Sequence, residues 1–423
     1  MEHAGDAIVN ARPAVPLEHG RLILHVYNCI SSIKKDKSVN GGMTPIRRLV
    51  TGNDSEGRSR VVWDGPAPDV HPLTPHANPW TDFWVWNETP LPLAGEDGGN
   101  LPYDFPGPIN GGHFRAVEGF APKGKYDRAG DPKYKPFHDP VMRPAGRTWD
   151  RGGRNAYTSD MHKTETVDYA ILFKGERNLI LDDGEVTWRP GDIVIDVGAY
   201  HQWTSPQQDG LVLYDMISAH FADGPVGLAQ GRDPVMRAPA DQKLPDGVKP
   251  ARRIVCLDKE PGKSTLVSDG PSPDVRIDPA RPGFASQRMW VTDSFPAKIV
   301  FETLHLPHTI EPPKNGSVLR SVTIPPDNAW KGKVGSAEVQ AYFRSMGSPG
   351  ASTYSAKAPH PYMQKTSSID FCVIQEGSVV LVLDTQEVAM KAGEIAVLRG
   401  TNHAWSNRSA KPAVITIASH DAM

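Results

Sequence analysis

An internal repeat constrains the fold of this chain more than any other feature of its sequence. The block from Met161 to Trp203 aligns without a gap with the block from Met363 to Trp405, at a constant offset of 202 residues. The pairs that stay in register are Asp168/Asp370, Gly175/Gly377, Gly191/Gly393 and His201/His403. Because chance would not hold these residue types in register over such a length, we expect two tandem copies of one structural unit.

The repeat extends upstream of these blocks at an offset of 205 residues. Arg47–Val50 matches Arg252–Val255, and Asp64–Pro66 matches Asp269–Pro271. The stretch between the copies is rich in Gly, Pro, Asp and Ala, which is typical of a linker. The predicted organisation is an appended arm at 1–43, a first domain at 44–221, a linker at 222–250 and a second domain at 251–423.

Within each copy, short β-rich runs alternate with turn residues. Val167–Phe173 and Ile193–Val197 are examples, and Asp183-Gly184 is a tight-turn signal between two such runs. The chain carries 39 glycines and 40 prolines, most of them between apolar runs. This pattern predicts an all-β fold of sandwich or barrel type, with no helix of any length.

The spacing of polar residues in the repeated blocks resembles the two motifs of the cupin superfamily. The first cupin motif is Gly-x5-His-x-His-x(3,4)-Glu-x6-Gly, and the first copy keeps its spacing with His162, Thr164, Asp168 and Gly175. The second motif, Gly-x5-Pro-x-Gly-x2-His-x3-Asn, is matched from Gly191 to His201 with one residue fewer. The resemblance implies a bicupin, with two tandem double-stranded β-helix (jelly-roll) barrels whose motif residues point into the barrel mouth.

The chain departs from the metal ligands of that family. Metal-binding cupins hold Fe, Mn, Zn or Ni with His and Glu side chains, and the first copy retains His162, Asp168 and His201. Two histidines and one carboxylate suit non-haem Fe(II), so the resemblance implies either no cofactor or one divalent metal (Fe, Mn or Zn) in the first barrel. The positions in the second copy are Gln364, Thr366, Asp370 and His403, and the amide of Gln364 is a poor replacement for imidazole.

The first copy is therefore the predicted working site. The candidate catalytic residues are His162, Asp168, His201 and Thr164, and the candidate substrate-binding residues are Tyr200, Trp203 and Trp188. Structural roles are open alternatives: the aspartates are equally consistent with strand capping, the histidines with buried hydrogen-bonded groups, and Thr164 with packing. A Pro- and Gly-rich stretch from Pro66 to Pro144 carries aromatic residues that would suit a lid or a packed surface loop.

Three functions are compatible with these residues. The first is an enzyme that acts on an apolar or aromatic acid, or a polyketide-like metabolite, by acid–base chemistry: dehydration, decarboxylation, isomerisation or cyclisation. His162 or His201 would transfer the proton, and Asp168 would orient the imidazole. The second is an Fe(II)-dependent cupin dioxygenase on His162, Asp168 and His201, by analogy with ring-cleaving bicupins. The third is a non-catalytic ligand-binding or storage bicupin.

Composition bears on partners and location. The net charge is −3 and no basic run stands out, so we expect a small-molecule ligand and neither a nucleic acid nor a membrane partner. A homodimer is left open. Cys29, Cys256 and Cys372 form no CxxC pair, which favours a reducing, cytoplasmic location without disulfides.

Overall fold

The computed structural model of the protein describes residues 45–71, 78–101, 105–121, 124–205, 207–221, 226–231 and 243–423. The predicted arm at 1–43 lies outside the described residues, and so does part of the predicted linker at 222–250. The chain from Thr44 onwards forms one compact unit that contains both copies of the repeat.

Most of the first copy is built around an eight-stranded sheet. Its order is β16-β15-β12-β9-β14-β5-β4-β3. The bounds, in chain order, are β3 Asp69–His71, β4 Trp80–Trp86, β5 Gly112–Gly119, β9 Thr166–Lys174, β12 Ile193–Val197, β14 Gly210–Ser218, β15 Arg252–Glu260 and β16 Lys263–Pro271. All its neighbouring strands pair antiparallel except β12 and β15, which are parallel.

A second eight-stranded sheet has the equivalent order, β2-β1-β23-β20-β25-β19-β18-β17. The bounds are β1 Arg47–Asn53, β2 Ser59–Pro66, β17 Asp274–Ile277, β18 Ala285–Thr292, β19 Ser317–Ile324, β20 Ser368–Glu376, β23 Ile395–Arg399 and β25 Ala413–Asp421. The all-β prediction is confirmed, and each strand of one sheet has its repeat counterpart at the same place in the other.

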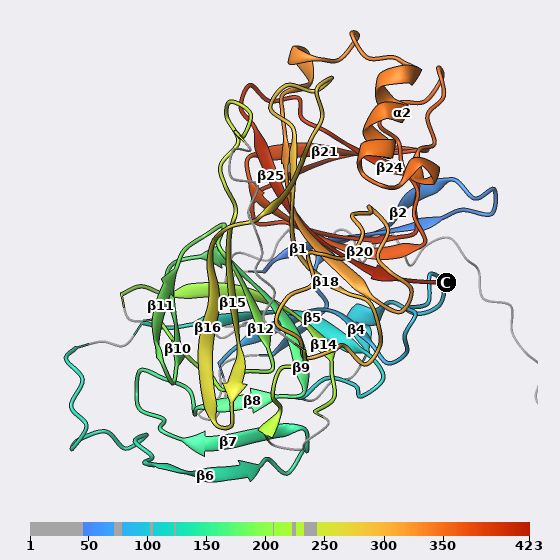
Figure 1. Ribbon diagram of the computed structural model, residues 1–423. Helices are drawn as coiled ribbons and strands as arrows, with labels where there is room; N and C mark the ends of the chain where they lie inside the picture. The colour runs from blue at the N-terminus through green and yellow to red at the C-terminus, as the bar shows by residue number, and fades with distance from the viewer. Residues whose placement is uncertain are drawn as a thin grey trace, which may run out of the picture. The chain divides into compact units, whose positions relative to one another are not determined.

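The two copies exchange their first hairpins. Strands β1 and β2 precede the first copy in sequence, yet β1 pairs with β23 of the second, as Arg48 opposite Ile395 illustrates. Reciprocally, β15 pairs with β12 of the first copy, with Arg253 opposite Ile193. Figure 1 shows yellow β15 and β16 beside the green strands, and blue β1 and β2 among the orange and red ones. The sequence repeats and the hydrogen-bonded sheets therefore have different boundaries.

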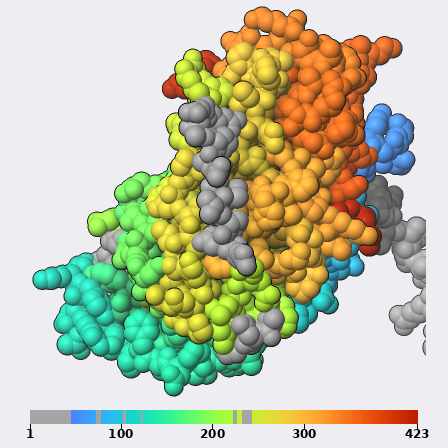
Figure 2. Space-filling view, in the orientation of Figure 1, coloured from blue at the N-terminus to red at the C-terminus, as the bar shows by residue number. Residues whose placement is uncertain are grey.

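Three three-stranded sheets complete the described β-structure. Their orders are β11-β10-β13, β22-β21-β24 and β6-β7-β8. The bounds are β6 Phe137–Met142, β7 Thr148–Gly152, β8 His162–Thr164, β10 Arg177–Leu181, β11 Gly184–Trp188, β13 Gln202–Thr204, β21 Ser378–Leu383, β22 Glu387–Lys391 and β24 His403–Ser406. Every residue of β6 is exposed, and the teal segment around it lies at the surface in Figure 2.

Strand alternation divides most of the buried apolar residues among three large cores. Along β9, Val167, Tyr169 and Ile171 join a core shared by the two large sheets, where Phe114 stacks on Phe371 with ring centroids 4.9 Å apart. The alternate residues of β9 and β12 face the interior of the first barrel. Asp168 and Asp196 belong to this inward-facing set of alternate residues, so their carboxylates point into the barrel.

The expectation of no helix is contradicted within the described residues. Helix α2 spans Ser336–Ser345 and buries Val339, Tyr342 and Phe343 on one stripe against the second barrel. Glu338 Oε2 accepts a hydrogen bond of 2.9 Å from the Gly335 N–H, which satisfies a free donor at the helix start. A ten-residue segment is too short for its helical period to stand out among β-rich neighbours.

Two further expectations, on membrane-spanning segments and on the cysteines, can be compared with the structure only for the residues that it describes. Within the described ranges, every helix is too short or too polar to cross a lipid bilayer. Cys256 and Cys372 are buried free thiols. Cys29 lies outside the described residues.

Candidate functional site

The first barrel contains a cavity of about 710 Å³. Its polar wall includes His162 from β8, Asp168 from β9 and His201 next to β13. Its aromatic wall is formed by Trp80, Phe105, Phe120, Tyr157, Trp203 and Tyr214. The cavity is thus large enough for a small organic molecule and combines an apolar surface with a few polar groups, as ligand sites commonly do.

His162 and His201 lie side by side in this wall. Their backbones pair through hydrogen bonds of 3.0 and 2.9 Å, and their ring centroids are 4.4 Å apart. Nδ1 of His162 lies 2.7 Å from the Asp160 carbonyl oxygen, which can only accept, so this nitrogen carries a proton. The accessible Nε2 of each ring has no hydrogen-bond partner among the described residues.

The contact of Asp196 with His201 was not predicted from the sequence. Oδ2 of Asp196 lies 2.6 Å from Nδ1 of His201, and the Ala199 carbonyl oxygen lies 2.9 Å from the same nitrogen. Both neighbours accept, so Nδ1 of His201 is protonated and the Nε2 lone pair is available in the neutral ring. Asp196, rather than the expected Asp168, orients the imidazole. The available signal was a carboxylate within the apolar run Ile193–Val197, where the second copy has Leu398.

The two histidines have opposite electrostatic surroundings. Burial lowers the pKa of His201, but the Asp196 carboxylate and the Ala199 carbonyl raise it more, so that it lies above the ordinary value. Burial, the neighbouring His201 and the positive charge of Arg143 lower the pKa of His162 well below the ordinary value. His162 is therefore neutral in neutral solution, whereas His201 is the better proton acceptor of the pair.

Asp168 is a buried carboxyl group beside this pair. It is directly opposite Asp196 across the β9–β12 ladder, and its Oδ1 has no hydrogen-bond partner among the described residues. Burial, followed by the charge of Asp196, raises the pKa of Asp168 well above its ordinary value. In its neutral form, Asp168 is a proton donor at the cavity wall.

The predicted metal ligands do not assemble into a three-ligand centre. A metal centre needs at least three His, Cys, Asp or Glu side chains whose ligand atoms lie close together. Among the described residues, only Asp69, His71 and Asp82 form such a group, with all ligand atoms within 4.8 Å of one another. His162, Asp168 and His201 do not meet that distance. The donor set predicted for Fe, Mn or Zn therefore does not fit a metal in this arrangement, although both Nε2 atoms are free.

The group of Asp69, His71 and Asp82 is accounted for by protein contacts. Asp82 accepts hydrogen bonds of 2.7 and 2.9 Å from Arg115, and His71 stacks on Trp80 with centroids 4.5 Å apart. The guanidinium neutralises the one fully buried carboxylate of the group. A bidentate ion pair of this kind occupies the oxygens that a cation would need.

The other predicted site residues divide into two sets. Thr164 and Trp203 line the cavity, and Thr164 Oγ1 lies 3.3 Å from the Thr148 hydroxyl. Tyr200 and Trp188 do not line it. Trp188 is in the barrel core, and Tyr200 lies against Arg151 and Lys163, so the expectation that these two contact a substrate is not supported by their positions.

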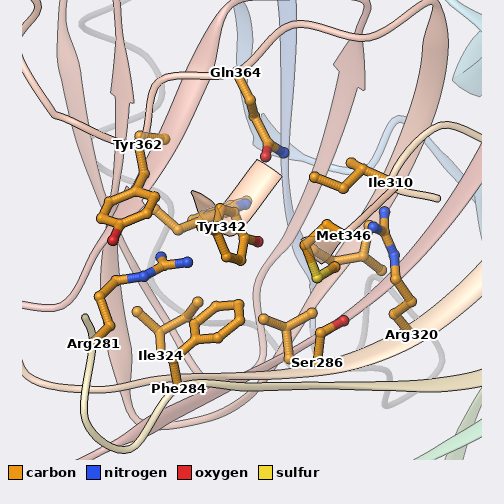
Figure 3. A pocket seen from close by; sticks show the side chains of 14 residues that line it. Arg281, Phe284, Ser286, Ile310, Arg320, Ile324, Tyr342, Met346, Tyr362 and Gln364 are labelled. Atoms are coloured by element: carbon orange, nitrogen blue, oxygen red, sulfur yellow. The ribbon is translucent and has the colours of Figure 1, made fainter. Parts of the chain in front are cut away.

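The equivalent place in the second barrel is nearly filled. Gln364 Nε2 lies 3.3 Å from His403 Nε2, so the amide donates to the nitrogen that is free in His201. The pocket there measures about 50 Å³. Figure 3 shows Arg281 directed between the rings that line it, and its guanidinium carbon lies 3.6 Å from the ring centroid of Tyr362 and 3.9 Å from that of Phe284. Thr366 and Asp370 belong to a separate chain of hydrogen bonds through Ser368.

Comparison with curated proteins gives short matches to biosynthesis cluster proteins and to a cupin-domain-containing oxidoreductase. The chain is 52% identical over 48 residues to a phomopsin biosynthesis cluster protein of Diaporthe leptostromiformis, which is 11% of this chain. It is 44% identical over 46 residues, also 11% of this chain, to a cupin-domain-containing oxidoreductase of Hypocrea virens. The matches span about a quarter of the length of these relatives, 25% and 24% respectively. No protein-family model matches the chain.

Solved structures of low sequence identity resemble the chain over a larger share of its length. A quercetin 2,3-dioxygenase from Acinetobacter baumannii is 10% identical, with 89% of this chain and 87% of that one covered and a TM-score of 0.33. A salicylate 1,2-dioxygenase from Pseudoaminobacter salicylatoxidans is 9% identical, with 73% and 71% covered and a TM-score of 0.31.

The fold assignment rests on the chain's own architecture. Two sheets of equivalent strand order each carry a copy of the duplicated motif block, and in the first barrel the motif residues line a cavity. The chain is a cupin-fold protein with two tandem barrels.

Proposed function

We propose that the first barrel is an enzyme site of secondary metabolism, which performs acid–base chemistry on an apolar or aromatic organic acid or a polyketide-like metabolite. The observation that carries the proposal is the Asp196–His201 pair, with 2.6 Å between Oδ2 and Nδ1 and a free Nε2 at a cavity with aromatic walls. The short matches to proteins of fungal biosynthesis clusters support the metabolic setting.

The residues support proton transfer in two directions. His201 Nε2 takes a proton from a substrate carbon or hydroxyl, while Asp196 stabilises the imidazolium that forms. Asp168, whose raised pKa favours its protonated form, gives a proton to a substrate oxygen. In a dehydration, the proton on the carbon beside a carbonyl group passes to His201, and the electron pair of that C–H bond forms a double bond to the next carbon. The hydroxyl on that next carbon takes the Asp168 proton and leaves as water. Solvent then returns the proton from His201 to Asp168.

His162 has a different part in this proposal. Its lowered pKa makes it a poor base, so it accepts a hydrogen bond from a substrate hydroxyl and orients the molecule toward His201. Pairs of titratable groups whose surroundings push their pKa values apart are typical of acid–base sites.

The test uses the full-length protein with a panel of aromatic and polyketide-type hydroxy acids, in D2O, without oxygen and with a chelator present. NMR and mass spectrometry would follow product and deuterium incorporation. The wild type and a His403→Asn variant should turn over at least one compound, and a His201→Asn variant should lose that turnover by about 100-fold or more. Turnover that requires both oxygen and a metal would overturn the proposal in favour of a dioxygenase.

A further inference from the structure

One guanidinium at the cavity wall differs from its neighbours. Four arginines of the described residues line the cavity, and three of them lie beside a carboxylate: Arg115 beside Asp82, Arg143 beside Asp150 and Arg154 beside Asp160. The fourth, Arg177 on β10, has no ion pair among the described residues although it is 5% exposed. Its Nε and Nη1 atoms are buried and have no hydrogen-bond partner there.

The surroundings of Arg177 are those of an anion site. The buried hydroxyls of Thr204 and Ser205 line the same cavity and also have no hydrogen-bond partner among the described residues. Gly119 keeps this space open, because a Cβ there would lie 2.8 Å from Ser205 Oγ and 3.0 Å from Arg177 Nη1. A buried charge without a partner is costly, so an arrangement that retains one indicates that a ligand supplies the opposite charge.

We infer that Arg177 binds a carboxylate of the substrate, in two-point contact through its guanidinium and with the Thr204 and Ser205 hydroxyls as further donors. The fork of an arginine matches a carboxylate in this way. This inference rests on the proposed function, since it assigns one group of the substrate to the same cavity.

Trp203 connects this anion site with the proton-transfer residues. The Arg177 guanidinium carbon lies 6.0 Å from the Trp203 ring centroid, and the His201 ring lies 5.0 Å from Trp203 on an edge-to-face contact. An aromatic or apolar skeleton packed on Trp203 would therefore have its carboxylate at Arg177 and its reacting atoms toward His201. Tyr214, 5.8 Å from Trp203, stays protonated because burial raises its pKa to about 12, and it adds another donor.

The second barrel keeps Trp405 in the place of Trp203 and His403 in the place of His201, but it lacks the two charged groups. Val379 stands in the place of Arg177 and Leu398 in the place of Asp196. The anion site and the proton-transfer pair are thus both confined to the barrel that has the large cavity. Val379 also indicates that the fold accepts an apolar side chain at this position.

The test measures binding of benzoate and of benzamide to the full-length protein by calorimetry and saturation-transfer NMR. Wild type should bind benzoate more tightly than benzamide, and Arg177→Met should weaken benzoate binding by roughly 10- to 100-fold with little effect on benzamide. Arg189→Met, which removes an exposed arginine paired with Glu176 outside the cavity, is the matched control and should behave as wild type. Arg177→Val, which copies the second barrel, is the second variant if Arg177→Met does not fold.

Two results would overturn the inference. One is a wild type that binds benzoate no more tightly than benzamide at ligand concentrations up to about 50 mM. The other is an Arg177→Met variant that still prefers benzoate over benzamide. Failure of this inference is distinguishable from failure of the proposed function. His201→Asn should keep the benzoate preference while turnover is lost. A preference that survives in Arg177→Met, with turnover lost in His201→Asn, removes the anion site alone. Turnover that survives in His201→Asn, with the preference lost in Arg177→Met, removes the acid–base function alone.

Discussion

Lys163 Nζ donates a hydrogen bond of 2.7 Å to Asp258 Oδ2, and the two side chains, both fully buried, come from different copies of the repeat. Lys163 lies between His162 and Thr164 on β8, and Asp258 is on the exchanged strand β15. Asp258 Oδ1 also accepts a hydrogen bond of 3.0 Å from the Tyr200 N–H, next to His201. The exchanged hairpin is therefore fastened to both segments that carry the histidine pair.

Replacing Asp258 with Ala should lower the free energy of unfolding by about 3–5 kcal/mol, because it leaves the Lys163 ammonium buried without its counter-charge. Urea unfolding followed by circular dichroism measures the loss. A Lys163→Met/Asp258→Leu double variant should recover most of it, since neither charge then remains buried. A double variant as unstable as Asp258→Ala would show that the ion pair is not what stabilises this contact.

Replacing Asp196 with Asn should lower the pKa of His201, because the carboxylate that favours the imidazolium is removed. NMR titration of the ring protons measures the change, with Asp370→Asn in the second barrel as the control that should leave the pKa of His201 unaltered.

The raised pKa of His201 also makes stability depend on pH. The Asp196–His201 pair stabilises the fold fully below pH 6.5, the ordinary pKa of histidine, and this stabilisation is lost as the pH rises through the higher pKa of the folded protein.

The stability difference between the wild type and Asp196→Asn should consequently be larger at about pH 5.5 than at about pH 9. Urea unfolding at both pH values tests this sign. A difference that grows with pH would mean that Asp196 does not stabilise the charged form of His201.

Replacing His162 with Gln should leave the protein folded and remove its activity. The change copies Gln364, whose amide lies 3.3 Å from His403 Nε2, so the new amide would donate to His201 Nε2 and occupy its lone pair. The matched change in the other barrel is His403→Ala, which should keep activity and lower the free energy of unfolding by about 1–3 kcal/mol. Activity lost with His403→Ala but kept with His162→Gln would locate the working site in the second barrel.

Residues 251–423 produced alone should not fold as a monomer. Without β1, the edge of β23 loses its partner, and β15 and β16 lose the sheet of the first barrel to which they belong. Heteronuclear NMR should show poorly dispersed spectra for this fragment, and co-production with residues 44–250 should restore a soluble, dispersed complex. A well-dispersed spectrum of the isolated fragment would contradict the structural importance of the exchange.

Much of the architecture could be predicted from local information. The offset of 202 residues predicted two equivalent units, and the β-rich runs between Gly, Asp and Pro predicted an all-β fold. Both features can be recognised in the sequence because the preferences that form strands and turns act over a few residues. The helix at Ser336–Ser345 was not predicted from the sequence, because its stability comes from packing Val339 and Phe343 against a core formed by distant strands.

The candidate site was predicted in part. The motif spacing singled out His162, Asp168 and His201, which line one cavity, but it assigned Asp168 the contact with His201 that Asp196 makes. Spacing along one strand says which face a residue occupies, but not which residue of a neighbouring strand lies nearest. Arg177 was missed for the same reason, because an unpaired guanidinium is recognisable only once its neighbours are known.

The sequence by itself determined the duplication, the β-strand content and the greater number of cupin-type residues in the first copy, all of which follow from residue order and short-range preferences. Only the tertiary structure decided the hairpin exchange and the Asp196–His201 contact. It also decided that, in the described residues, His162, Asp168 and His201 do not form a close three-ligand group, and that Arg281 fills the second barrel. These features depend on distances between strands far apart in the chain, which are set by how the sheets pack rather than by any local pattern.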